Sequence, residues 1–105
     1  MDKQLKKFLQ NDVSIKHKLT TRNSAGEWNF ADAVISKGRV EHRMTILRVK
    51  VGQELTSKTR IFFDSPVVVA MEDLVTLPTG EEVAVVGVDL KYDSKGKVDH
   101  KVVYV

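Results

Sequence analysis

Cysteine is missing from this 105-residue chain, and so is any apolar stretch as long as a membrane span. Without cysteine the protein has no disulfide, no thiolate metal ligand and no cysteine nucleophile, and its composition suits folding in a reducing cytoplasm. A transmembrane helix needs about 20 mostly apolar residues, and a signal peptide needs an apolar run that residues 1–12 lack. We therefore expect a soluble, unsecreted protein with no membrane partner.

Motifs of known chemistry are equally scarce. The adjacent pairs Glu72-Asp73 and Glu81-Glu82 would point to opposite faces of a strand, so solvation at turns explains them better than a catalytic carboxylate couple. A phosphate-binding Gly-x-x-x-x-Gly-Lys loop is absent. Three histidines occur, none at a metal-ligand spacing: His17, His42 and His100. We predict no catalytic residue, no metal and no cofactor, and hence no enzyme.

Charge of one sign does not dominate the chain. Lysine and arginine number 17 and the acidic residues 14, which gives a net charge of +3. This balance favours polyanions only mildly and falls short of a dedicated nucleic-acid binder, so local clusters decide the argument. The densest basic segment contains Lys37, Arg39, Arg43, Arg48 and Lys50.

Alternating and β-branched apolar runs are what the chain does have. Val13 to Thr20 and Leu55 to Phe63 alternate with a period of two, which predicts half-buried strands. The last third predicts a three-stranded meander over 73–77, 83–92 and 98–105, with Pro/Gly and Asp/Gly turns between the strands. We expect one all-β domain over residues 1–105, a small antiparallel β-barrel of about six strands. Its predicted core includes Leu74, Val86, Val88 and Leu90.

The N-terminal segment, residues 1–12, has a different pattern. Leu5, Phe8 and Leu9 recur at helical spacing with lysines opposite, which predicts a short amphipathic helix. Such a helix is too short to be stable alone, so it would dock on the domain or become ordered in an assembly.

Trp28 and Phe30, farther along, are expected to anchor the core or a subunit contact rather than to stack on bases.

Several short motifs, taken in their order, resemble one protein family. They are Gly38-Arg39-Val40-Glu41, Gly52-Gln53-Glu54, Arg60-Ile61-Phe62-Phe63 and Asp73-Leu74-Val75-Thr76-Leu77-Pro78-Thr79-Gly80, followed by Val86-Gly87-Val88 and the ending from Tyr92 to Val105. From about Val13 onward the chain resembles the head-closure proteins of tailed bacteriophages, also called stopper, head-completion or minor capsid proteins.

The resemblance implies a structural role in the virion. It implies a small β-barrel, assembled in the host cytoplasm, that forms a homo-oligomeric ring of sixfold or twelvefold symmetry at the head-tail interface. The ring lies below the portal and adaptor, closes the head filled with double-stranded DNA, and docks a tail terminator or tail tube. In relatives a long loop projects from the barrel and gates the DNA, and residues 41–55 correspond to it by position.

Residues 41–55 are also unusual on physical grounds, because both faces of the alternating pattern carry apolar residues. Such a segment is either a buried strand or a hairpin that pairs with copies of itself by strand addition. In the hairpin interpretation the contacts between subunits are Thr45, Leu47, Val49 and Val51. The groups facing DNA phosphates in the channel are then Arg43, Arg48 and Lys50. An ordinary hairpin with a solvated basic face explains the same residues equally well.

Two other classes of function remain open. A nucleic-acid-binding barrel of the OB-like or SH3-like kind would have similar strands and a similar charge balance, and its isolated monomer would bind DNA or RNA in a salt-dependent way. A small enzyme or ligand-binding barrel would need converging polar groups in a pocket, and the sequence offers no such set.

Overall fold

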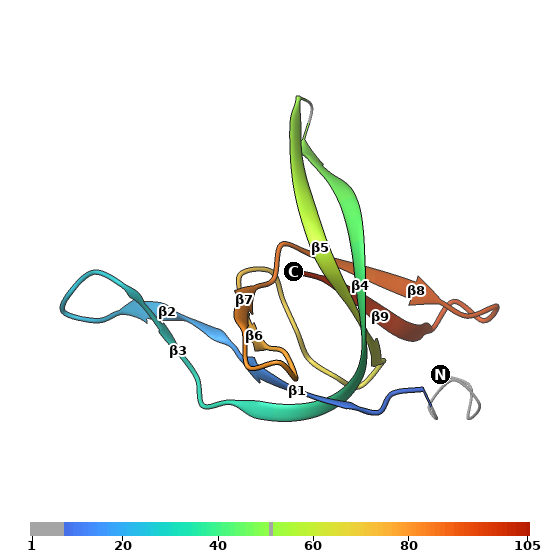
Figure 1. Ribbon diagram of the computed structural model, residues 1–105, viewed down its shortest axis with the longest axis horizontal. Coiled ribbons are helices and arrows are strands. Elements are labelled where there is room, and N and C mark those ends of the chain that lie inside the picture. Colours follow the sequence, from blue (N-terminus) through green and yellow to red (C-terminus); the bar gives the residue numbers. More distant parts are fainter. Residues whose placement is uncertain (1–7, 51) are drawn as a thin grey trace.

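The computed structural model describes residues 8–50 and 52–105, with the backbone alone at residues 48–50. In these residues the fold is all-β, with antiparallel ladders and no helix, which confirms the predicted class (Figure 1). Seven strands form one sheet, and β2 and β3 pair separately as a projecting arm. The strands are β1 (Asn11–Lys16), β2 (Lys18–Arg22), β3 (Trp28–Phe30), β4 (Val34–Lys50), β5 (Gln53–Asp64), β6 (Leu74–Thr76), β7 (Glu82–Ala84), β8 (Gly87–Tyr92) and β9 (Val98–Tyr104).

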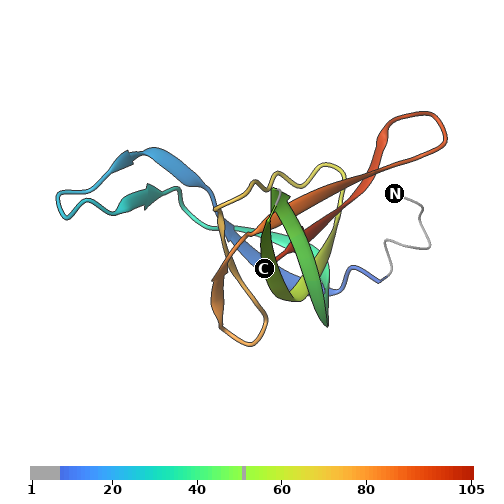
Figure 2. The ribbon, with the colours of Figure 1, turned by 90° about the horizontal axis from the view of Figure 1, so that it is seen from above.

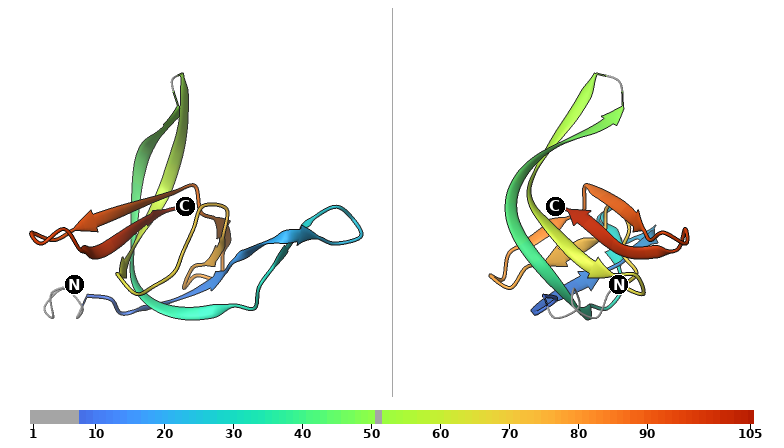
Figure 3. Two further views of the ribbon diagram at one scale, coloured as in Figure 1. Left: turned by 180° about the vertical axis from the view of Figure 1, so that it is seen from behind. Right: turned by 90° about the vertical axis from the view of Figure 1, so that its right-hand side faces the viewer.

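The seven-stranded sheet is curled but not closed. Its order is β7-β6-β1-β4-β5-β9-β8, so its two edge strands are consecutive in the chain. Only Val85 and Val86 join them, and the three Cα–Cα steps from Ala84 to Gly87 span at most about 11 Å, so the sheet must bend until its ends approach (Figure 3). No ladder pairs β7 with β8 in the described residues, and the predicted closed barrel of about six strands is therefore wrong.

The core lies inside this curl and comes mainly from alternate positions of the strands. Ser57, Thr59, Ile61 and Phe63 are buried along β5 while their neighbours are not, which confirms the predicted alternation. Fully burying a side chain such as Ile61 stabilises the fold by about 1.5–3 kcal/mol. The core cluster comprises Val13, Ile15, Ile61, Phe63, Val69, Val75, Leu77, Val85 and Val103.

The three segments of the predicted meander contain strands, but the middle segment is not one continuous strand. Its middle run, 83–92, is two strands rather than one, because β7 pairs with β6 and β8 pairs with β9. The break falls at Val85, whose N–H donates to the Asp73 carbonyl at 2.8 Å, and at Val86, whose N–H donates to the Tyr104 carbonyl at 2.8 Å. These two hydrogen bonds go to different parts of the sheet, so the run divides between Val85 and Val86, directly before Gly87.

The predicted core residues of this region are largely displaced by one register position. The fully buried positions are Val75, Leu77 and Val85. Of the residues predicted, Val88 packs partly against the core, Leu74 and Val86 are half-buried, and Leu90 is exposed. A shift of one residue exchanges the two faces of a strand, which explains the error.

The predicted N-terminal helix is not seen in residues 8–12, the part of the segment that the structure describes. Residues 8–12 hold a turn at Phe8 and the start of β1 at Asn11 rather than a helix, and residues 1–7 lie outside the described part of the chain. The ladder partners explain this outcome, because Asn11 to Ile15 pair with Gly38 to Val34 of β4.

The arm formed by β2 and β3 projects away from the sheet (Figures 1 and 2). Its turn is closed by Asn23, whose side-chain oxygen accepts hydrogen bonds from the N–H groups of Ala25 and Glu27. Trp28 is 39% exposed and does not belong to the core, so of its two expected roles only the subunit contact remains open. Its ring lies instead beneath the cationic groups of Lys18 and Arg22, each 4.2 Å from the ring centroid.

Candidate functional site

The β4–β5 hairpin projects beyond the curled sheet at residues 41–55, as predicted (Figures 1 and 3). Its ladder runs from Gly38 paired with Phe63 out to Lys50 paired with Gln53. β1 pairs with β4 only over residues 34–38, and β9 pairs with β5 only over residues 60–64. From residue 43 to residue 57 each strand of the hairpin therefore has a free edge within the described structure.

The register gives the hairpin two distinct faces. Thr45 is opposite Ser57 and Leu47 is opposite Leu55, and directly paired residues share a face. We call this the inner face, because it continues the buried positions of β5. Ile46 is opposite Thr56 on the outer face.

The predicted subunit contacts lie on the inner face where they are described. Thr45 and Leu47 are both half-buried within the chain itself, so only part of their surface is free for a neighbour. Val49 is in β4, but its side chain is outside the description, and Val51 lies outside the described residues.

The most exposed apolar groups of the hairpin among the described side chains are on the outer face, which sequence reasoning missed. Met44 is 72% exposed and Ile46 is 64% exposed. Exposed apolar side chains that adjoin one another mark an interaction surface more often than isolated ones do. We call Met44 and Ile46 the apolar knob. The alternation that selected Thr45 and Leu47 as subunit contacts places Met44 and Ile46 on the opposite face of the same strand.

Positive charge is concentrated on the hairpin. Residues 39–60 contain six Lys or Arg and two Glu, a net charge of +4, which exceeds the +3 of the whole chain. Of the three residues predicted to face DNA, Arg43 is exposed, and the side chains of Arg48 and Lys50 lie outside the described part. Glu41 binds the nearest arginines at the base, with Arg60 Nη2 at 2.7 Å and Arg39 Nε at 3.3 Å.

A hollow of about 350 Å³ lies between the inner face of the hairpin and β8. Its wall includes Leu47 from the hairpin, Met71 from the loop before β6, Val88 and Asp89 from β8, and Tyr104 from β9. Gly87 forms part of the floor, where a Cβ atom would approach Leu47 Cδ1 to 3.1 Å. The hollow is mainly apolar with one acidic group at its rim.

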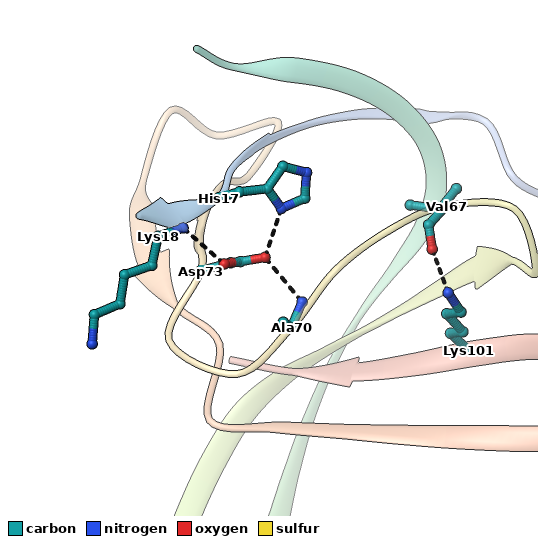
Figure 4. Close-up of polar contacts among 6 residues, drawn as sticks. All are labelled: His17, Lys18, Val67, Ala70, Asp73 and Lys101. Atoms are coloured by element: carbon teal, nitrogen blue, oxygen red, sulfur yellow. Dashed lines mark hydrogen bonds and ion pairs between the residues drawn. The ribbon is translucent and has the colours of Figure 1, made fainter. Parts of the chain in front are cut away.

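A second polar cluster surrounds Asp73, which is buried where the arm meets the sheet (Figure 4). Its carboxylate accepts hydrogen bonds from the N–H of Lys18 at 3.0 Å and of Ala70 at 2.9 Å, and lies 2.8 Å from His17 Nδ1. Burial by itself would raise the pKa of Asp73, but the hydrogen bonds from Lys18, His17 and Ala70 outweigh it and hold the pKa below its ordinary value. The expectation of a solvated turn is therefore wrong for Asp73.

This cluster has the geometry of a structural junction. The His17 carbonyl also accepts the N–H of Ala31, so both strands of the arm are fixed at their root. Nearby, Lys101 Nζ donates to the Val67 carbonyl at 2.6 Å and ties β9 to the same loop (Figure 4). Among the described residues, no serine or threonine hydroxyl is hydrogen-bonded to the side chain of His17 or Asp73.

Residues 8–50 and 52–105 contain no cluster of three or more His, Asp or Glu side chains that could hold a metal ion. Within the same ranges no helix is long and apolar enough to cross a membrane. Comparison with models of protein families, with curated proteins and with solved structures found no match to the chain.

Proposed function

We propose that the protein is a structural subunit of the head-tail connector of a tailed bacteriophage. Many copies form a closed ring of sixfold or twelvefold symmetry below the portal and adaptor, and the ring retains the packaged DNA and receives the tail. The role is mechanical and involves no bond making or breaking. The resemblance of the motifs from Gly38 to Val105 to head-closure proteins supports this assignment.

The projecting β4–β5 hairpin is the observation that carries the proposal. An isolated two-stranded ribbon is at best marginally stable in water, so a ribbon that extends beyond its sheet gains most from contacts with another molecule. Its free edges offer backbone groups for strand pairing. Around a ring axis, the hairpins of successive copies would meet one another and surround a channel.

The charge on the hairpin suits double-stranded DNA in such a channel. Each phosphate contact contributes attraction that does not depend on base sequence and that weakens as salt increases. The projecting residues 41–55 contain three Lys or Arg and two Glu, a net charge of +1, so each subunit of a ring adds positive charge around the DNA without specific base contacts. Arg43, Arg48 and Lys50 are the residues that we assign to this surface.

The proposal is tested by location and by gating. Labelled antibody or cryo-electron microscopy is expected to find the chain at the neck of the virion. Deletion of residues 44–51 is expected to leave a folded sheet, because the core lies below the hairpin, but to let DNA leave heads that lack tails. A shortened β8–β9 turn, with Ser94 to Gly96 removed, is the matched control and is expected to retain DNA.

Two results would overturn the proposal. One is a particle that contains no copy of the chain, and the other is full DNA retention after the hairpin deletion. Strong binding of duplex or single-stranded DNA by the free monomer, lost steeply with salt, would favour the nucleic-acid-binding barrel instead.

A further inference from the structure

The base of the hairpin carries two complementary apolar surfaces that face opposite ways. The apolar knob, Met44 and Ile46, stands on the outer face with most of its surface exposed. The hollow lies on the inner face, between Leu47 and β8. The chain thus presents a convex and a concave apolar surface on the two sides of one ribbon.

We propose that the apolar knob of one copy inserts into the hollow of the next copy, so that the occupant of the hollow is a second copy of this chain. This inference rests on the proposed function and specifies which surfaces meet between neighbouring subunits. It concerns side chains on the two faces of the ribbon and leaves the free backbone edges of β4 and β5 available for strand pairing.

The placement of the two surfaces determines the symmetry of the contact. In a two-fold dimer the knob of each copy would enter the hollow of the other copy within one shared interface. The knob and the hollow would then have to lie on the same face of the molecule. Here they lie on opposite faces, because Ile46 and Leu47 are consecutive residues of one strand. A contact from knob to hollow is therefore head-to-tail, and a head-to-tail contact generates a ring when its rotation closes.

The charges beside the two surfaces are complementary. Arg43 is exposed next to Met44 in the sequence, and no ion pair joins it to another described residue. Asp89 lies at the rim of the hollow, where Lys91 Nζ is 2.8 Å from its carboxylate. When the knob enters the hollow, the guanidinium of Arg43 can approach Asp89 of the neighbouring copy, and Arg48 and Lys50 then remain for the phosphates of DNA. Such a rim pair steers the encounter and fixes its orientation more than it adds affinity.

The absence of cysteine makes a direct test possible in the full-length protein. Two single variants, Ile46→Cys and Met71→Cys, place one thiol on the knob and one at the hollow, where Met71 is 53% exposed. The variants are mixed and treated with a short bismaleimide cross-linker, and the products are identified by peptide mass spectrometry. The control replaces Ile46→Cys with Ile35→Cys, an equally exposed apolar position at 71% on the part of β4 that pairs with β1.

We expect the 46–71 product to exceed the 35–71 product at least about fivefold, the enrichment that a contact worth about 1 kcal/mol gives. Adding Met44→Lys to the Ile46→Cys variant is expected to remove the enrichment. Equal yields of the 46–71 and 35–71 products would overturn the inference, and so would a dominant 46–46 product, which would indicate a two-fold contact. If the chain is found at the virion neck but the 46–71 cross-link does not form, this packing is refuted and the proposed function stands. If the cross-link forms but particles contain no copy of the chain, the proposed function is refuted.

Discussion

The hydroxyl of Ser57 lies 3.0 Å from the carbonyl oxygen of Val105, to which it donates, although the two residues are 48 positions apart. The same hydroxyl also lies within hydrogen-bonding distance of the Thr59 carbonyl, at 2.9 Å. The N–H of Val105 in turn donates to that carbonyl at 3.0 Å. The described C-terminal residue therefore fixes the base of the hairpin, just below the segment where β4 and β5 have free edges.

Replacing this hydroxyl is expected to weaken the domain moderately. Ser57→Ala should lower the free energy of unfolding by about 1 kcal/mol, because the hydroxyl is fully buried while both acceptors keep a backbone donor. Urea denaturation measures the change. Thr56→Ala, the exposed neighbour on the outer face, is the control, and an equal loss in both variants would contradict the role given to Ser57.

Two glycines on strands are expected to respond to the same substitution with losses of stability of different size. A Cβ atom at Gly38 would lie 2.9 Å from Phe63 Cε1 and 3.0 Å from Ile61 Cγ2, and both side chains are fully buried. Gly38→Ala should therefore cost about 1–3 kcal/mol by overpacking. Gly87→Ala meets only the end of the Leu47 side chain, which is half-buried and can rotate, so its cost should stay below about 1 kcal/mol. Thermal or urea unfolding compares the two, and a larger loss at Gly87 would show that the hollow is more tightly packed than described.

Acid is expected to destabilise the junction of the arm through Asp73. Its pKa is held below the ordinary 3.8 in the folded protein, so its contribution to stability is complete above that value. The contribution is lost as the pH falls from there through the lower folded-state pKa.

Asp73→Asn should lower the free energy of unfolding at pH 7 by about 1–3 kcal/mol, since an amide cannot accept all of these hydrogen bonds. The variant should also lose less further stability between pH 5 and pH 2 than the unaltered protein, as urea titrations at each pH would measure. Asp32→Asn, an exposed site near the arm, is the control, and parallel pH curves for Asp73→Asn and the unaltered protein would contradict the assignment.

The arm is expected to open before the sheet unfolds. It consists of two short strands, and Trp28 on it is well exposed, so few apolar contacts oppose local opening. Trp28 is the single tryptophan of the chain, and its fluorescence therefore reports on the arm. We expect the fluorescence midpoint to lie about 5 °C below the circular-dichroism midpoint, the shift that a difference of about 1 kcal/mol produces in a domain of this size.

Moving the reporter provides the control for this prediction. In the double variant Trp28→Phe/Phe62→Trp the indole sits on β5, where Phe62 is half-buried. The two midpoints should then coincide. A single coincident transition in the unaltered protein would mean that the arm unfolds together with the sheet.

Local pattern predicted those elements that have one face buried. The alternation from Leu55 to Phe63 was correct because the core covers one side of β5 and the other side is solvated. The projecting hairpin at 41–55 followed from the resemblance to head-closure proteins, whereas the apolar residues on both of its faces left a buried strand equally open. Its outward apolar residues, Met44 and Ile46, were not identified, because alternation alone does not say which face is covered.

Long-range contacts account for the rest of the differences. Asp73 is 56 residues from His17, and no local spacing indicates that a buried carboxylate will serve the root of the arm. Likewise, the valine-rich run at 83–92 has a glycine, Gly87, beside its break, but a single glycine within a strand pattern does not show that the run divides there. Hydrogen bonds from Val85 and Val86 to separate parts of the sheet divide it into two strands. Such divisions follow from topology, which a single sequence does not specify.

The two-residue link of Val85 and Val86 also determines how the domain would respond to tension. Covalent backbone, rather than a ladder, holds β7 near β8, so pulling these strands apart must first separate a neighbouring pair. β7 is held to β6 by three residue pairs, whereas β8 is held to β9 by six. Under load the weaker β6–β7 pairing would yield first, and the larger part of the sheet, with the hairpin attached, would remain intact.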